Sequence, residues 1–117
     1  MSNSETDNPA PATPVSETFF QDRAKQFKAL SNPHRLRIFM TLAGCLEPGC
    51  VMESDVDHYE NCQREFSEQL QLAPSTVSHH FKELRNAGLV HMERQGKRVL
   101  VWIDADTVKA LRSVLGG

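Results

Sequence analysis

The sequence predicts a mainly α-helical domain with a small β-hairpin, which places it in the α+β class. Apolar residues recur at helical spacing along much of residues 17–88, and again after Asp104. Between these blocks, residues 89–103 are rich in valine, with isoleucine and tryptophan, as strands are. With 117 residues, of which 39% are hydrophobic, the chain can hold one domain with a modest core.

The expected domain covers residues 17–117 and begins with two helices. Residues 1–16 are rich in polar residues and proline and have no apolar period, so we expect a disordered tail. The first helix, 17–30, has an unusually aromatic face, which suggests a partner chain but would equally well close the domain's own core. Asn32 and Pro33 start the second helix as its capping side chain and first-turn proline. The aromatic face consists of Phe19, Phe20, Ala24, Phe27 and Leu30.

A long connection, residues 44–61, is expected after the second helix. It lacks a helical period, contains Pro48 and Gly49, and carries a run of acidic residues. A connection of this length in a compact domain is usually functional or mobile. The next helix is expected to be short, with Asn61 as its candidate cap, and to end in a tight turn at 71–73.

The stretch 72–88 carries helix signals at both ends. Pro74 suits the first helical position, and Gly88 can adopt the left-handed conformation that ends a helix. One face is apolar and holds Val77, Phe81 and Leu84. The opposite face is polar and holds Ser75, His79, Lys82 and Asn86. Taken alone, this pattern fits a DNA-reading helix and an ordinary amphipathic surface helix equally well.

The net charge of −2 is unevenly distributed along the chain. Residues 1–18 carry −3, and residues 45–68 carry seven acids against Arg64, for −6. Residues 75–103 carry +3 and three histidines. The basic charge therefore lies on and just after the polar-faced helix, where contacts with phosphates would need it.

A hairpin and a last helix complete the expected domain. The hairpin turns at Gly96, which is surrounded by basic residues, and Asp104 or Asp106 can cap the last helix. The apolar face of that helix consists of Val108, Leu111, Val114 and Leu115. A short helix, a tight turn, a polar-faced helix and a basic hairpin together make a winged helix-turn-helix.

Three segments resemble the ArsR/SmtB family of bacterial repressors. They are Leu-Ser-Asn-Pro-His-Arg-Leu-Arg-Ile at 30–38, Ser-Thr-Val-Ser-His-His-Phe-Lys-Glu-Leu-Arg-Asn-Ala-Gly-Leu-Val at 75–90, and Arg-Gln-Gly-Lys-Arg-Val at 94–99. They occur in the family's order within residues 17–115. One departure is Ala73, where the family often has a serine or another capping residue. The loss of such a cap costs about 1 kcal/mol of helix stability.

The resemblance implies a transcriptional repressor that forms homodimers through its first and last helices. Such a dimer places two copies of residues 74–86 in successive major grooves of double-stranded operator DNA, and DNA binding requires no cofactor. The candidates for base and phosphate contacts on this helix are Ser75, Thr76, Ser78, His79 and Lys82. The candidates for phosphate or minor-groove contacts in the wing are Arg94, Lys97 and Arg98.

Family repressors usually release DNA when an inducer binds, and two of the family's ligand sites bear on this chain. One site uses carboxylates and histidines of the last helix, but residues 104–117 contain no histidine. The other uses a Cys-x-Cys pair before the turn, and here only Cys62 matches, because Arg64 occupies the second position. The first site is expected to be absent, and the second is half present.

Three cysteines, Cys45, Cys50 and Cys62, suggest a different ligand set around the connection. Three thiolates suit a thiophilic ion with trigonal or pyramidal geometry, such as arsenite, antimonite or mercury. We expect arsenite as the inducer, bound by thiols of one protomer or of both. Bridging these residues could tilt the reading helices and weaken operator binding.

Several alternatives to this metalloid site remain at the level of sequence. Cys45 could be a small buried hydrophobe, or Cys45 and Cys50 could form the redox pair of a persulfide or oxidant sensor, although the acidic surroundings disfavour a reactive thiolate. The chain could also be a DNA-binding regulator without a metal inducer, controlled by a partner on its aromatic helix. A harder site for zinc could combine His58 with Asp55, Asp57 or Glu60, although a solvated acidic loop explains these carboxylates as well.

Other functional classes are disfavoured. The chain is shorter than most enzymes, and His79 and His80 fall on the predicted DNA-facing helix. No run approaches the roughly 18 apolar residues of a membrane span, and the first residues lack a signal-peptide pattern. We therefore expect a cytoplasmic protein without a membrane partner. An odd number of cysteines also agrees with a reducing compartment.

Overall fold

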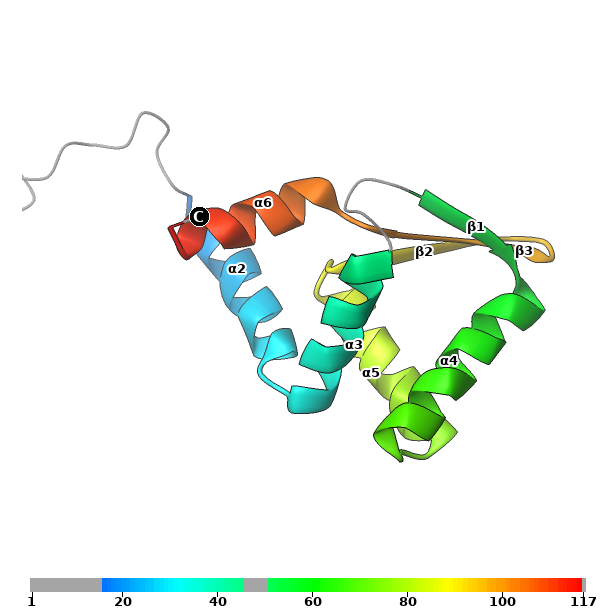
Figure 1. The fold of residues 1–117 in the computed structure, drawn as a ribbon. Helices are drawn as coiled ribbons and strands as arrows, with labels where there is room; N and C mark the ends of the chain where they lie inside the picture. Colours follow the sequence, from blue (N-terminus) through cyan, green and yellow to red (C-terminus); the bar gives the residue numbers. More distant parts are fainter. Residues whose placement is uncertain (1–15, 46–50, 117) are drawn as a thin grey trace, which may run out of the picture.

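The computed structural model describes residues 16–45 and 51–116, with the side chain of Cys45 also outside the described part (Figure 1). Residues 1–15 of the predicted tail lie outside it as well. The described part forms five helices and three strands. In chain order these are α2 (Glu17–Leu30), α3 (Pro33–Cys45), β1 (Val51–Asp55), α4 (Val56–Leu70), α5 (Pro74–Asn86), β2 (Val90–Gln95), β3 (Arg98–Ile103) and α6 (Ala105–Val114).

The first two helices start as the sequence predicts. Ser16 caps α2, because its Oγ accepts a hydrogen bond from the Phe19 amide at 3.1 Å. Asn32 Oδ1 accepts from the amides of His34 and Arg35, at 2.9 and 3.1 Å, so it satisfies two donors at the start of α3. The predicted helix start at Asn32-Pro33 is therefore confirmed.

The prediction of an irregular connection up to Asn61 is wrong. Residues 51–55 form strand β1, and α4 begins at Val56. Asp55, not Asn61, is the cap of α4, because its Oδ1 accepts from the His58 amide at 2.6 Å. Of the acidic residues that suggested a loop, Glu53 lies on β1, Asp55 forms this cap, and Asp57 and Glu60 lie exposed on α4.

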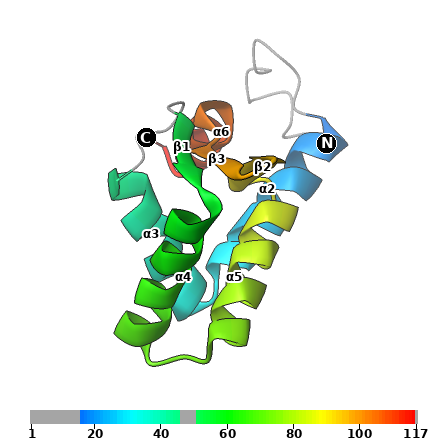
Figure 2. The same ribbon diagram turned by 90° about the vertical axis from the view of Figure 1, so that its right-hand side faces the viewer.

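The helix-turn-helix is formed by α4 and α5, which lie side by side in Figure 2. Gln71 ends α4 in the left-handed conformation, with φ of 55°, so that the chain turns back within three residues. Pro74 occupies the first turn of α5, and Ala73 supplies no side-chain cap, as predicted. At the other end Gly88, with φ of 79°, allows the Leu89 amide to bond the Leu84 carbonyl at 3.0 Å, which closes the helix.

The sheet has a third strand that the sequence did not reveal. Its order is β1-β3-β2, with β3 antiparallel to both neighbours. The predicted hairpin is confirmed: Gln95 pairs with Arg98 across the turn, where Gly96 has φ of 62°. Every second side chain of β3 points inward and is buried; these are Val99, Val101 and Ile103.

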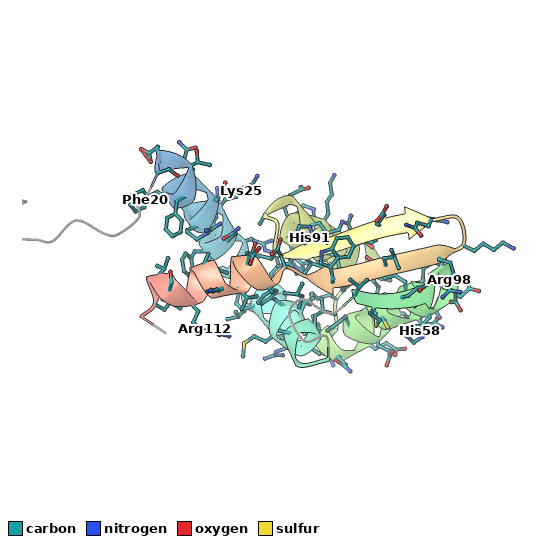
Figure 3. All side chains as sticks on the ribbon, turned by 90° about the horizontal axis from the view of Figure 1, so that it is seen from above. Phe20, Lys25, His58, His91, Arg98 and Arg112 are labelled. Atoms are coloured by element: carbon teal, nitrogen blue, oxygen red, sulfur yellow. The ribbon has the colours of Figure 1, made fainter. Side chains whose placement is uncertain are left out.

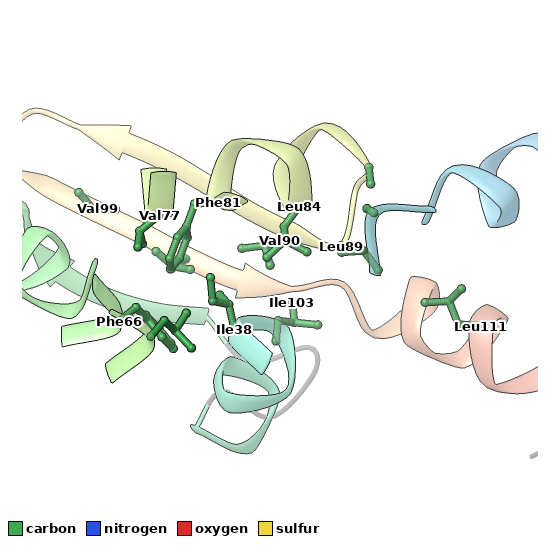
Figure 4. Packing of buried hydrophobic residues seen from close by; sticks show 14 residues of the cluster. Ile38, Phe66, Val77, Phe81, Leu84, Leu89, Val90, Val99, Ile103 and Leu111 are labelled. Carbon is green, nitrogen blue, oxygen red and sulfur yellow. The ribbon is translucent and has the colours of Figure 1, made fainter. Parts of the chain in front are cut away.

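The core lies between the inner face of this sheet and the apolar faces of the helices (Figure 4). The predicted apolar face of α5 is confirmed, because Val77, Phe81 and Leu84 are all buried. The largest fully buried side chains are Ile38, Leu84, Leu89, Ile103, Val77 and Val90. This packing holds α5 on the sheet by its apolar face, so that its polar face is left outward.

Helices α2 and α6 lie at one end of the molecule, and the wing and the start of α4 lie at the other (Figure 1). Asp104 caps α6 by accepting from the amides of Asp106 and Thr107. Part of the apolar surface of both helices remains uncovered: Phe20 is 58% exposed and Leu115 is 76% exposed. Across the helices that the structure describes, none combines the length and the apolar character that a membrane crossing requires.

Candidate nucleic-acid interface

The outward face of α5 presents most of the predicted contact residues. Ser75, Ser78, His79 and Lys82 are exposed, and Thr76 is half-buried. In Figure 2, α5 and β2 lie on the side of the molecule away from α3 and β1. A polar helix face beside a hairpin is the arrangement that enters a major groove while the hairpin follows the backbone.

Ser78 has a second contact that sequence reasoning missed. Its Oγ donates to Gln63 Oε1 of α4 at 3.2 Å. The bond joins the two helices of the helix-turn-helix on their exposed side, so it orients the Ser78 hydroxyl. No sequence signal marks such a pair, because the residues are fifteen positions apart.

The three predicted basic residues of the wing are all exposed, but they are not equivalent. Arg98 Nη2 lies 2.6 Å from Glu53 Oε1 of β1, so this guanidinium already has an anionic partner. Arg94 Nε donates to the Gly96 carbonyl at 3.4 Å. The Lys97 carbonyl accepts from the Val56 amide at 3.1 Å, which fastens the wing turn to the start of α4.

His80 does not belong to the outward, polar face of α5. It is 6% exposed, whereas its neighbour His79 is exposed. Arg35 Nη1 lies 3.4 Å from His80 Nδ1, and Arg35 Nε donates to the Ala29 carbonyl at 2.7 Å. Because a guanidinium can only donate, this contact requires an unprotonated Nδ1 on His80.

The surroundings of His80 favour its neutral form. Burial lowers its pKa below the ordinary histidine value, and the nearby Arg35, His34 and His79 lower it further. Glu83 acts in the opposite direction and offsets part of this effect. The polar contact between Arg35 of α3 and His80 of α5 therefore contains an uncharged histidine.

Of the predicted thiol ligands, only the Cys62 side chain is described; Cys50 and the Cys45 side chain lie outside the described residues. Cys62 is half-buried on α4, with its Sγ 3.8 Å from His58 Nε2. It borders a cavity of ≈ 260 Å³ between α3, β1 and α4. The described residues lining this cavity are Thr41, Leu42, Met52, Cys62, Glu65, Phe66 and Gln69.

The alternative zinc site finds no support in the structure. Asp55 is engaged as the cap of α4, with its Oδ1 on the His58 amide. Within residues 16–45 and 51–116, no three histidine, cysteine or acidic side chains cluster in a way that could hold a metal ion. His58 and Cys62, one helical turn apart, form a pair rather than a complete site.

Comparison with known proteins identifies the family. The model of the bacterial regulatory protein arsR family matches residues 59–92, which cover most of α4, all of α5 and the start of β2. The uncharacterized HTH-type transcriptional regulator YceK of Bacillus subtilis (strain 168) is 34% identical over 87 residues, which make up 74% of this chain and 75% of that protein. The chain belongs to the arsR family.

One further relative and two solved structures are also similar to the chain. A cadmium resistance transcriptional regulatory protein CadC homolog of Staphylococcus aureus is 30% identical over 77% of this chain, which spans 64% of that relative's length. The structure of HlyU from Vibrio cholerae N16961 has a TM-score of 0.56 and 26% identity, over 86% of this chain and 94% of HlyU. The homodimeric winged helix-turn-helix DNA-binding domain Mb0332 of Mycobacterium bovis has a TM-score of 0.56 and 22% identity, over 92% of this chain and 87% of Mb0332.

Membership of the arsR family confirms both the resemblance and the winged helix-turn-helix fold. It also confirms that the chain is a transcriptional regulator and not an enzyme. The segment that the arsR family model covers is the helix-turn-helix itself, where the exposed polar face of α5 lies.

Proposed function

We propose that the chain is a homodimeric repressor that binds double-stranded operator DNA and releases it when a thiophilic metalloid, arsenite above all, binds its cysteine thiolates. The observation that carries the DNA-binding part is the exposed polar face of α5 beside the basic wing. Ser75, Ser78, His79 and Lys82 lie on that face and are the side chains for base edges and nearby phosphates. Thr76, which is half-buried, contributes its hydroxyl at the edge of the surface.

The wing adds affinity more than sequence information. Arg94, Lys97 and Arg98 are exposed, and phosphate contacts by such residues are independent of the base sequence. Since Arg98 is paired with Glu53, Lys97 and Arg94 are the principal contacts of the wing.

The dimer forms through α2 and α6. Both helices lie at one end of the molecule and keep exposed apolar side chains there, among them Phe20, Val114 and Leu115. Exposed apolar groups of this kind mark protein interfaces when they gather on one surface. The similar fold of Mb0332 is homodimeric, and a two-fold dimer would present two α5 helices to two half-sites.

The inducer site consists of Cys45, Cys50 and Cys62, and thiolates are the ligands that trivalent arsenic, antimony or mercury prefer. Cys62 supports this role by its position on the first helix of the helix-turn-helix. The start of the same helix is bonded to the wing through Val56 and the Lys97 carbonyl. A ligand that shifted α4 would thus act on the reading helix and on the wing together. The relation to a regulator named for cadmium resistance also favours a thiophilic ion.

The experiment is an operator-release titration with a fluorescent DNA label. Arsenite should dissociate the wild-type complex, and Cys45→Ser, Cys50→Ser and Cys62→Ser should each raise the arsenite concentration required by about tenfold or more, because three-thiol coordination loses a ligand in each variant. Parallel titrations with zinc and with a polysulfide test the zinc and redox alternatives. If all four proteins release DNA alike, the thiol site is wrong; if only polysulfide releases it, the chain is a redox sensor.

A further inference from the structure

A second basic surface lies beside the reading helix, on α2 and α3. A pocket of ≈ 210 Å³ opens where α2, α3 and the last turn of α5 meet. Its cationic lining residues are Lys25, Lys28 and Arg35, and Asn86 adds an amide from α5. Alanines form the rest of the lining, apart from one carboxylate, Glu83.

The balance of charge in this pocket favours an anion. Three positive side chains face one carboxylate, and Asn86 can donate as well. Lys25 and Lys28 are exposed, and in the part of the chain that the structure describes neither ammonium group makes an ion pair or a hydrogen bond; the bond from Ser31 goes to the Lys28 carbonyl. Their charge is therefore directed to solvent or to a ligand.

The Arg35 side chain in this pocket is held in place by two contacts. Its Nε donates to the Ala29 carbonyl at 2.7 Å, and its Nη1 contacts His80 Nδ1 at 3.4 Å. Two contacts hold the guanidinium plane, so an anion that meets it loses less side-chain entropy than one that meets a mobile lysine. Planar guanidinium groups also match the geometry of phosphate oxygens.

The pocket adjoins the polar face of the reading helix, because Asn86 of that face is part of its lining. In the view from above, Lys25 on α2 and His91 on β2 are both on the side on which α5 lies (Figure 3). From there α2 runs on to the end of the molecule that carries Phe20. In a dimer built on that end, the pocket lies between the reading helix and the two-fold axis.

We propose that Lys25, Lys28 and Arg35 bind a backbone phosphate of the operator, on the dimer side of the bases that α5 reads. The inference rests on the proposed DNA-binding function and extends the interface from α5 and the wing onto α2 and α3. Free inorganic phosphate has the same chemistry, but the shared face with α5 selects DNA as its source.

The test is the salt dependence of operator affinity for Lys25→Ala/Lys28→Ala. Loss of one phosphate contact lowers the magnitude of the slope of log K against log salt by about 0.9, so the double variant should lose about 1 from the slope. Its affinity at low salt should fall at least about tenfold. Arg37→Ala/Lys109→Ala removes the same charge from exposed positions outside the pocket and should keep the wild-type slope. Ethylation interference should show phosphates whose modification hinders the wild type but not the pocket variant.

Each outcome decides between separate claims. A pocket variant with the slope and the interference pattern of the wild type overturns the phosphate contact while the operator-binding function stands. If inorganic phosphate, added to DNA-free protein at constant ionic strength, shifts wild-type amide signals that the pocket variant leaves unshifted, and the slope does not change, the pocket takes free phosphate and the proposal is wrong. If the wild type itself shows no salt-dependent operator binding, the proposed function fails, and the extended interface fails with it.

Discussion

His80 shows at the scale of one residue how neighbouring positions of a helix can differ in role. His79 is exposed and available to DNA, whereas His80 is buried against Arg35. In the sequence the two histidines are adjacent and look alike. Their separation follows from the helical turn of about 100° per residue, which carries His80 to the side that packs on α3.

The depressed pKa of His80 predicts a stability that depends on pH. Because the folded state holds His80 neutral, the unfolded state binds more protons below about pH 6.5, and the free energy of unfolding should fall as the pH drops through that value. Urea denaturation between about pH 7.5 and 5.5 should show a smaller fall for His80→Gln, which cannot titrate. Equal falls in the two proteins would show that protonation of His80 is not coupled to folding.

Ala73 offers a gain in stability at a single position. It precedes α5 with φ of −62° and ψ of 145°, the extended conformation of a capping residue, but has no side-chain acceptor. Ala73→Ser should raise the free energy of unfolding by about 1 kcal/mol in urea denaturation. Ala105→Ser is the control, since Asp104 already caps α6, and should change little. The same free energy of unfolding for both variants would mean that the hydroxyl at position 73 does not cap α5.

At the scale of elements, strand β1 connects the wing to α4. Glu53 on β1 pairs with Arg98, and Asp55 at its end caps α4. Both side chains of the ion pair are more than half exposed, so the pair contributes little to folding. In the proposed complex, its main effect is to reduce the positive charge that the wing presents to DNA.

Glu53→Gln is therefore expected to strengthen DNA binding without altering the fold. Removing the carboxylate makes the Arg98 guanidinium available for a phosphate, so the salt slope of binding should become steeper by about 1. The free energy of unfolding should change by less than about 1 kcal/mol. Filter binding over a salt series measures the slope, and Glu60→Gln on the outer face of α4 is the matched control. A slope unchanged from that of the wild type would place Arg98 outside the DNA interface.

The sequence predicted the elements whose signals are local and missed those that depend on distant partners. Asn32-Pro33, Pro74 and Gly88 each act within a turn of their own helix, and their predicted roles are confirmed. Residues 51–55 hold only two apolar side chains, and they become a strand because β3 pairs with them from nearly fifty residues away.

The start of α4 and the candidate sites show the same limit. Val56, Tyr59 and Phe66 form an apolar helical face, but the acidic residues between them obscured this helical spacing in the sequence. The exposed contact residues of α5 could be predicted from the helical spacing of its apolar and polar residues. The Ser78–Gln63 bond and the Arg35–His80 joint required the folded chain.

At the scale of the whole molecule, the proposed function gives the two ends different roles. The wing and α4 form one end, whereas α2 and α6 form the other and leave apolar side chains uncovered. The proposed repressor needs both ends, because a single α5 reads only half of a near-palindromic site.

Charge placed on the apolar end should separate the protomers. Phe20→Glu/Leu115→Glu puts two carboxylates where the proposed dimer buries apolar surface, so it should weaken dimerisation by about 100-fold or more in sedimentation equilibrium. Met40→Glu changes an equally exposed apolar residue on α3 and should remain dimeric. Dimers of unchanged strength in the double variant would exclude α2 and α6 as the interface.

The most direct test of the central claim is selection of binding sites from random DNA duplexes by the wild type and by His79→Ala and Lys97→Ala/Arg98→Ala. The wild type should enrich a near-palindromic site with half-sites about one helical turn apart, or a multiple of it. His79→Ala should enrich a site with altered base preference, whereas the wing variant should enrich the wild-type site with weaker affinity. Enrichment of no site by the wild type, or of one identical site with undiminished affinity by all three proteins, would contradict the assignment of sequence reading to α5 and of phosphate binding to the wing.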